Sequence, residues 1–88
     1  MYAVVVNLTI IDPERDLRAL RDNMVRLVSH FSGFVTGYWT RRDDAGLSFL
    51  VFDSEATANE AAWQLRSAWT DDVARLETVE VREVVAHA

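Results

Sequence analysis

The sequence predicts an α+β domain in which two helices cover one face of a four-stranded antiparallel sheet. Three observations support this prediction. Strand-like and helix-like stretches follow in the order strand, helix, strand, strand, helix, strand, and each expected helix begins at a capping residue. The 88 residues show no linker or repeat, so we expect one domain over residues 1–88, and half of them are hydrophobic, which is enough for a core.

The first expected strand covers residues 2–11, where β-branched residues dominate, and it ends before Asp12-Pro13. Both of its alternating faces are largely apolar, which predicts a central strand that is covered on both sides. Asn7 is the only amide in this stretch. A buried amide needs hydrogen-bond partners or a ligand, so Asn7 is a candidate site residue.

The first expected helix begins at Asp12, a good N-cap, with Pro13 in its first position. Gly33 is expected to stop the segment, because glycine adopts left-handed backbone angles without strain. One apolar stripe follows at spacings of three and four residues, formed by Leu17, Leu20, Met24, Leu27, Val28 and Phe31.

Two strands joined by a polar turn are expected within residues 33–54, a stretch that holds five of the nine aromatic residues. We expect a turn of four or five residues over 42–46, because this stretch is polar and ends on Gly46. Neither strand has a cleanly polar face. Large apolar side chains are therefore expected on both faces of the sheet.

Ser54 is expected to cap the second helix, and residues 76–86 alternate apolar and charged side chains as an edge strand would. Trp63 falls off the apolar stripe of this helix. Two right-handed crossovers then give the ferredoxin-like β-α-β-β-α-β arrangement. Small residues in the stripe would let the helix approach the sheet closely, and the stripe comprises Ala58, Ala61, Ala62, Leu65 and Trp69.

The composition excludes several classes of function. There is no cysteine, and the two histidines are far apart in the sequence, so neither a metal site nor a thiol nucleophile is expected. The sequence has no glycine-rich phosphate loop or nucleophile elbow, and no bound cofactor is expected. A window of about 18 apolar residues and a basic leader are both absent, which favours a cytoplasmic protein without a membrane span.

Two helices can cover only one face of this sheet, so the other apolar face needs a partner. At about 25 cal/mol per Å², leaving it in water would forgo on the order of 10 kcal/mol. Two partners are considered, a nucleic acid stacked on the aromatic residues and a second copy of the same sheet.

The nucleic-acid alternative rests on a resemblance to RNA-recognition motifs, in residues 45–52 and 3–8. The residues that would bind nucleic acid differ, because Ala45 replaces the basic leading residue while Leu47 and Val4 replace stacking aromatics. Single strands are bound by stacked bases in a positive groove, whereas the net charge here is −5. No nucleic-acid partner is therefore expected. The matching positions are Gly46, Phe49, Phe52, Asn7 and Leu8.

The chain as a whole resembles the dimeric α+β barrel superfamily, near the antibiotic-biosynthesis-monooxygenase-like (ABM-like) domains. The resemblance implies a homodimer paired through the open sheet faces, with a small-ligand pocket between helices and sheet in some members. It is carried by the first strand leading into Asp12-Pro13, by Gly33-Phe34-Val35 and Gly37-Tyr38-Trp39, and by residues 49–56 running into an alanine-rich helix.

The same resemblance suggests site residues. Cofactor-free quinone-forming monooxygenases and haem-degrading enzymes of this superfamily place an asparagine on the first strand near the pocket, which points to Asn7. Independently of the resemblance, Trp39, Trp63 and Trp69 would be apolar walls for a flat ligand. Otherwise Trp69 is a core residue, and Trp39 and Trp63 pack at an interface or partly exposed. His30 would be an acid or base near neutral pH, or else a surface histidine at a helix end. No histidine lies in residues 54–69, where the haem-degrading relatives bind iron, so no haem is expected.

Two functions remain open at this point. The first is a homodimeric small-ligand-binding domain, acting as a cofactor-independent monooxygenase-like protein on an aromatic or quinol compound. In such chemistry the substrate activates oxygen, and the protein supplies an apolar cavity and one or two polar groups. The second is a non-catalytic dimeric domain for binding or stress response, with its aromatics in the interface. A cavity beside Asn7 would favour the first function.

Overall fold

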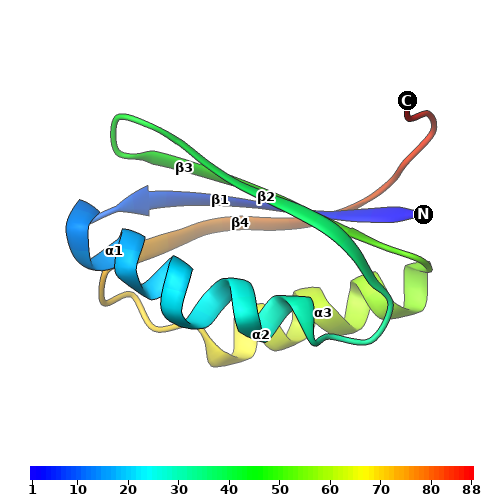
Figure 1. Cartoon of the computed structure of the whole chain (residues 1–88), viewed down its shortest axis with the longest axis horizontal. Helices are drawn as coiled ribbons and strands as arrows, with labels where there is room; N and C mark the ends of the chain where they lie inside the picture. The colour runs from blue at the N-terminus through cyan, green and yellow to red at the C-terminus, as the bar shows by residue number, and fades with distance from the viewer.

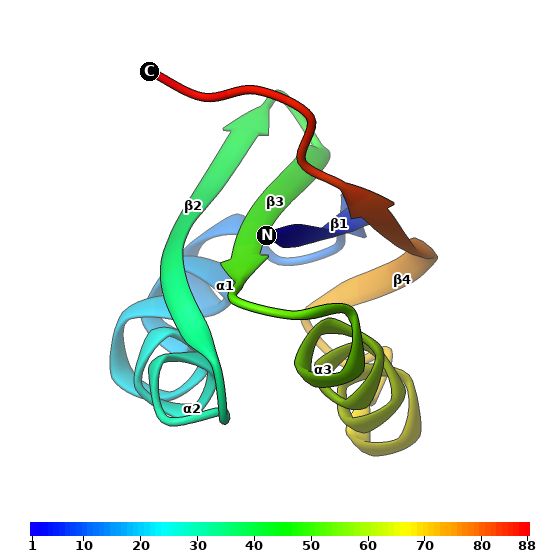
Figure 2. The ribbon, with the colours of Figure 1, turned by 90° about the vertical axis from the view of Figure 1, so that its right-hand side faces the viewer.

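The computed structural model describes all 88 residues and shows one four-stranded antiparallel sheet with the helices on one face (Figures 1 and 2). The strand order is β2-β3-β1-β4. Both findings confirm the α+β prediction and are consistent with a ferredoxin-like fold. The elements are β1 (Tyr2–Ile10), α1 (Pro13–Ala19), a π-helical turn η1 (Leu20–Met24), α2 (Val25–Ser29), β2 (Phe34–Arg42), β3 (Ala45–Phe52), α3 (Glu55–Ala68) and β4 (Ala74–Glu83).

Both helix starts lie where the capping residues predict them. The Asp12 carboxylate accepts a hydrogen bond from the Arg15 backbone N–H (3.2 Å), and Pro13 is the first helical residue. The Ser54 hydroxyl oxygen accepts one from the Thr57 backbone N–H (3.2 Å). Each bond satisfies a backbone donor that the first turn of a helix otherwise leaves unpaired.

The first helical segment, α1-η1-α2, is not a regular α-helix. In η1 the Val25 N–H donates to the Leu20 carbonyl five residues earlier, so this turn contains one residue more than an α-helical turn. Of the apolar stripe predicted for this segment, only Val28 is fully buried, and Leu27 is 52% exposed. The regular 3.6-residue period therefore overestimates how much of this stripe reaches the core. π-helical turns are rare and concentrate at functional sites.

The β2–β3 turn is shorter than predicted. Arg42 pairs directly with Ala45, so the turn has only the two residues Asp43 and Asp44. Asp43 takes a positive φ of 55°, which aspartate tolerates better than most residues. Gly46 lies inside β3 instead of in the turn, where a Cβ atom would come within 3.3 Å of the Leu8 side chain.

The core lies mainly between α3 and the sheet. Four of its eleven residues come from α3, whereas α1-η1-α2 contributes only Val28. The alanines of α3 let this helix approach β1 closely, as predicted. The first helical segment contacts the sheet mainly through its end, and Figure 2 shows this segment and α3 side by side beneath the twisted sheet. The core residues are Val4, Val6, Leu8, Val28, Leu50, Phe52, Ala58, Ala61, Ala62, Leu65 and Ala74.

Strand register decides which side chains face the helices. In β1, Val4 and Val6 face the helices, and the alternate residues, including Asn7, face the open side of the sheet. In β2, Trp39 packs against the core, so Tyr38 faces the open side with its partner Phe49. β1 is central and β4 is an edge strand, as the sequence predicts.

Gly33 provides a test of the connection between α2 and β2. Its φ is +78°, and a Cβ atom there would collide with the side chains of Asp53 and Thr57. We expect Gly33→Ala to lower the free energy of unfolding by at least about 1–3 kcal/mol, measured by urea denaturation. Ser32→Ala, at the exposed neighbouring position, should change it by less than about 0.5 kcal/mol. Equal effects of the two substitutions would contradict this interpretation.

Candidate functional site

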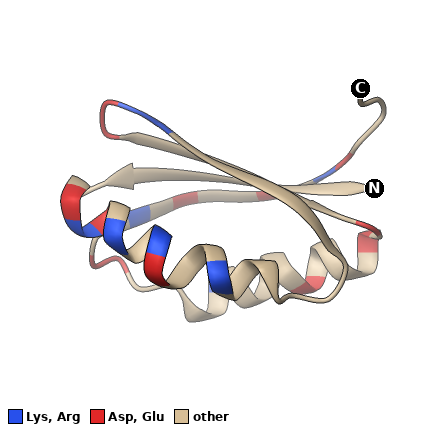
Figure 3. Cartoon of the chain, in the orientation of Figure 1, with Lys and Arg blue, Asp and Glu red and all other residues tan.

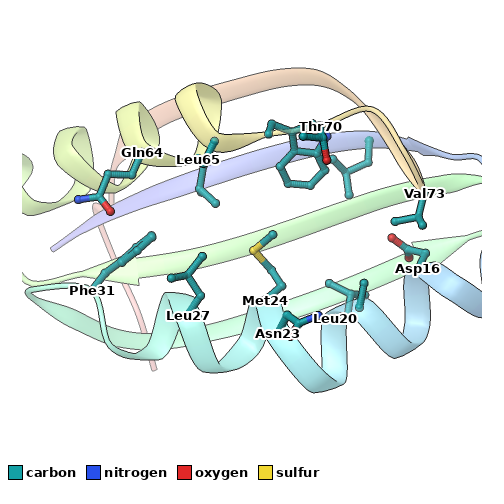
Figure 4. Close-up of a pocket in the computed structure, with 14 residues that line it drawn as sticks. Asp16, Leu20, Asn23, Met24, Leu27, Phe31, Gln64, Leu65, Thr70 and Val73 are labelled. Atoms are coloured by element: carbon teal, nitrogen blue, oxygen red, sulfur yellow. The ribbon is translucent and has the colours of Figure 1, made fainter.

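A cleft of about 320 Å³ separates the first helical segment from α3 (Figure 4). Ten of its fourteen lining residues are hydrophobic. One wall comes from α1-η1-α2 and the following turn, the other from α3 and the α3–β4 connection, and β1 contributes Leu8. The lining residues are Leu8, Asp16, Ala19, Leu20, Asn23, Met24, Leu27, Phe31, Gln64, Leu65, Ala68, Trp69, Thr70 and Val73.

Trp69 fixes one end of the α3 wall. It is the first residue after α3, and its indole Nε1–H donates to the Ala74 carbonyl at 3.1 Å. Beside it, a small void of about 20 Å³ continues toward the sheet and is bordered by Trp39 and Met24. The cleft therefore has apolar side chains on both walls, and one tryptophan ring is held in place by a backbone hydrogen bond.

Asp16 is the unusual residue of this cleft. It lies on α1 with only 5% of its surface exposed, and its carboxylate forms no hydrogen bond and no ion pair within the chain. No side-chain oxygen or nitrogen of the chain is both fully buried and unpaired, so the Asp16 oxygens keep some contact with solvent at the end of the cleft. Figure 4 shows the side chain at the end of the cleft near Val73. Few carboxylates in proteins are buried without a partner, because removing the charge from water is costly.

The electrostatic surroundings of Asp16 leave its charge poorly compensated. Burial raises the pKa of the Asp16 carboxyl, and the Arg41 guanidinium on β2 lowers it by a smaller amount. Arg41 itself donates to the Pro13 carbonyl at 3.4 Å. The other charges nearby, Arg15 of α1 and Asp72 of the α3–β4 connection, pair with each other at 3.2 Å. At neutral pH, the cleft thus ends in a carboxylate that can accept a hydrogen bond, a cation or a proton.

The sequence analysis missed Asp16, although a signal was present. Asp16, Leu20, Met24 and Val28 recur at intervals of four residues, which places the acid in the same row as the apolar stripe. An acidic residue within the apolar stripe of a helix indicates that its carboxylate is buried.

The four residues predicted from the sequence do not come together. Asn7 lies on the open sheet face, is exposed rather than buried, and donates from Nδ2 to the Thr78 hydroxyl at 2.9 Å. Trp63 is 62% exposed on α3 and does not line the cleft. His30 is exposed at the end of α2, with Nδ1 2.6 Å from the Arg26 carbonyl oxygen.

Trp39 is the predicted residue that lies nearest to the cleft. It borders the small void beside Trp69 and a second hollow of about 150 Å³ that it shares with Asp16 and Arg41. Its ring lies against Gly37, where a Cβ atom would come within 3.1 Å of it. The cavity predicted beside Asn7 is instead on the opposite face of the sheet, because the even-numbered residues of β1 face the helices.

The open sheet face has an apolar half and a charged half. Tyr38 of β2 is 66% exposed, and Leu47 and Phe49 of β3 are also exposed. On β4, Arg82 pairs with Glu80 and Arg75 with Glu77. Phe52, which matches the RNA-recognition pattern, is fully buried on the helical side.

The arginines near the aromatic residues of this face are accompanied by acids, since Asp43 and Asp44 follow Arg41 and Arg42 at the β2–β3 turn and the β4 arginines are ion-paired. Along the first helical segment, too, acidic residues are interspersed with the arginines (Figure 3). No three of the His, Asp and Glu side chains come together as a metal site would require. None of the helices is long and apolar enough to cross a membrane.

Comparison with protein-family models, with curated proteins and with solved structures gives no match to this chain. The function of this chain is therefore inferred from the geometry of the cleft and of the open sheet face.

The raised pKa of Asp16 predicts how stability depends on pH. Because the folded pKa lies above the unfolded one, the folded state binds the proton more tightly, and stability falls as pH rises from the ordinary carboxyl value through the folded pKa. Asp16→Asn removes the ionisable group and with it this pH-dependent loss of stability. We therefore expect the variant to unfold at a higher temperature than the wild type at pH 7.

The difference between the two proteins should shrink on acidification and vanish near the ordinary carboxyl pKa, as followed by circular dichroism. Asp22→Asn, an exposed carboxylate on the same helical segment, is the matched control and should show no such pH-dependent gain. A lower unfolding temperature for Asp16→Asn at pH 7 would show that the charge is stabilised by the fold.

Proposed function

We propose that this chain is a small-ligand-binding domain whose ligand occupies the cleft between α1-η1-α2 and α3. One observation carries the proposal: an apolar cleft ends in the carboxylate of a largely buried aspartate, which receives no hydrogen bond from the chain. Small-molecule sites combine apolar walls with a few polar groups that orient the ligand. The volume of about 320 Å³ lies at the lower end of the usual range for such sites, which suits a ligand of one or two rings.

An enzymatic form of this proposal is a cofactor-independent, monooxygenase-like reaction on an aromatic or quinol compound. The substrate hydroxyl would transfer its proton to the Asp16 carboxylate, and the resulting substrate anion would react at a ring carbon with molecular oxygen, the oxidant, to form a hydroperoxide. Loss of water from the hydroperoxide would leave a quinone carbonyl, so that one oxygen atom enters the product and the other leaves as water with the proton returned by Asp16. A proton acceptor in an apolar cavity supports this form, because an acid with a raised pKa is a better base at neutral pH. The Trp69 indole and Met24 would contact the rings of the substrate.

The alternative is a non-catalytic dimeric binding or stress-response domain. It is favoured by the placement of Asn7, Trp63 and His30, none of which lines the cleft. The two functions differ in one observable: the enzyme consumes oxygen with a quinol, whereas the binding domain does not.

We also propose that the domain is a homodimer paired through its open sheet face, as in a dimeric α+β barrel. No part of the chain covers the exposed side chains of Tyr38, Leu47 and Phe49. The charged half of the same face could form ion pairs with the charged half of a second copy, because it presents both Arg82 and Glu80.

Filling the cleft tests the ligand proposal. Ala68 lines the cleft on α3, so Ala68→Phe would occupy part of it. With 2-naphthol as the probe, we expect calorimetric titration to show binding to the wild type and at least about tenfold weaker binding to the variant, a loss of about 1.4 kcal/mol. Ser67→Phe adds the same ring at an exposed neighbouring position outside the cleft and should leave the affinity unchanged. Equal affinity of all three proteins would place the ligand elsewhere.

The molar mass in solution tests the dimer. Size exclusion with light scattering should give twice the 10.0 kDa chain mass. Phe49→Asp puts a charge in the apolar half of the open face and should shift the population toward monomer, because burying an unpaired charge is costly. Trp63→Asp makes a similar change at an exposed aromatic on α3 and should leave a dimer. A wild-type monomer at micromolar concentration would contradict the proposal.

A further inference from the structure

We propose that the cleft selects a small organic cation, an amine whose ammonium group binds the Asp16 carboxylate and whose hydrocarbon body lies along the apolar walls. This inference rests on the proposed function, since it assigns a ligand class to the same cleft. It goes further because it names the charge of the ligand and identifies Asp16 as the residue that recognises this charge.

The charge of the cleft lining points to a cation. Asp16 is the only charged residue among the fourteen that line the cleft. The remaining polar lining residues, Asn23, Gln64 and Thr70, are neutral. An anionic ligand would meet a like charge, and the basic side chains nearby line adjoining hollows instead of the cleft. Arg15 and Arg18 line one hollow, where Arg15 pairs with Asp72. Arg41 lines another and donates to the Pro13 carbonyl.

The burial of Asp16 shows what such a ligand would supply. The residue has 5% of its surface exposed and its carboxylate receives no hydrogen bond from the chain, so solvent at the end of the cleft is its only source of donors. An ammonium group offers three N–H donors and an opposite charge, and charge-assisted hydrogen bonds are about twice as strong as neutral ones. Because the site is already shielded from water, this interaction would be screened less by salt than a surface ion pair.

The walls of the cleft define the rest of the ligand. Leu20, Met24 and Leu27 border it on one side and Leu65 and Trp69 on the other, so a flat or branched hydrocarbon could contact both helical segments. The side chains of Met24 and Leu20 are free to adapt, because neither belongs to the fully buried core. One ring or two fused rings joined to the amine by a short alkyl chain match this arrangement.

A charge series tests the inference. The probes are 2-(1-naphthyl)ethylamine, 2-(1-naphthyl)ethanol and 1-naphthylacetate, which share the ring system and differ in the polar end. They are titrated calorimetrically at pH 7 into the wild-type protein. We expect the amine to bind at least about tenfold more tightly than the alcohol, and the carboxylate to bind most weakly.

Two variants identify the residue responsible. Asp16→Asn should remove the preference for the amine while retaining binding of the alcohol, which also shows that the variant is folded. Asp22→Asn changes the net charge by the same amount at an exposed position outside the cleft and should keep the preference. A preference that survives in Asp16→Asn would overturn the inference, because general attraction to an acidic protein would then explain it.

The outcomes separate this inference from the function on which it rests. Equal or tighter wild-type binding of the alcohol or carboxylate would overturn the cation assignment and leave the cleft as a ligand site. No binding of any of the three probes would overturn both proposals. Weaker binding of the amine to Ala68→Phe than to Ser67→Phe would locate the bound cation in the cleft.

Discussion

The close packing of α3 against β1 is the constraint on which the rest of this structure depends. Ala58, Ala61 and Ala62 bring this helix near the sheet, so α3 supplies four of the five helical residues of the core. The first helical segment then has little left to bury, and only Val28 enters the core cluster. Most of its other apolar side chains, Leu20, Met24 and Leu27 among them, border the cleft. The cleft is thus a consequence of unequal packing by two helices on one sheet.

Asp16 acquires its properties from the same asymmetry. An acid in the apolar row of a closely packed helix would be excluded from the fold or paired with a cation, because a buried lone charge is costly. Here the row faces a cleft, so the carboxylate is shielded from water without being enclosed by the core. A residue that reduces stability at neutral pH and needs no structural partner is the kind of feature that a binding site retains.

The sequence predicts most of the fold because its signals are local. Asp12, Pro13 and Ser54 mark the helix starts, and the alanine stripe of α3 predicts close packing against the sheet. It predicts the site poorly because the site depends on relative position. The π-helical turn alters the helix beyond Leu20, and no residue pattern marks it.

The placement of Asn7 shows the same limit. Alternation along β1 defines its two faces, but only the register with β3 and β4 determines which face the helices cover. The predicted turn over 42–46 was too long, because Asp43 takes a positive φ that lets Asp43 and Asp44 close the turn alone, and Gly46 lies within β3.

Because the core and the cleft are formed by different residues, substitutions in one need not affect the other. Mutations at Leu20, Met24 or Leu27 alter the cleft without removing a member of the buried cluster. Selection can therefore explore new ligands on one wall while α3 preserves the fold. The helical segment that packs least against the core is therefore the one whose side chains can change most without loss of the fold.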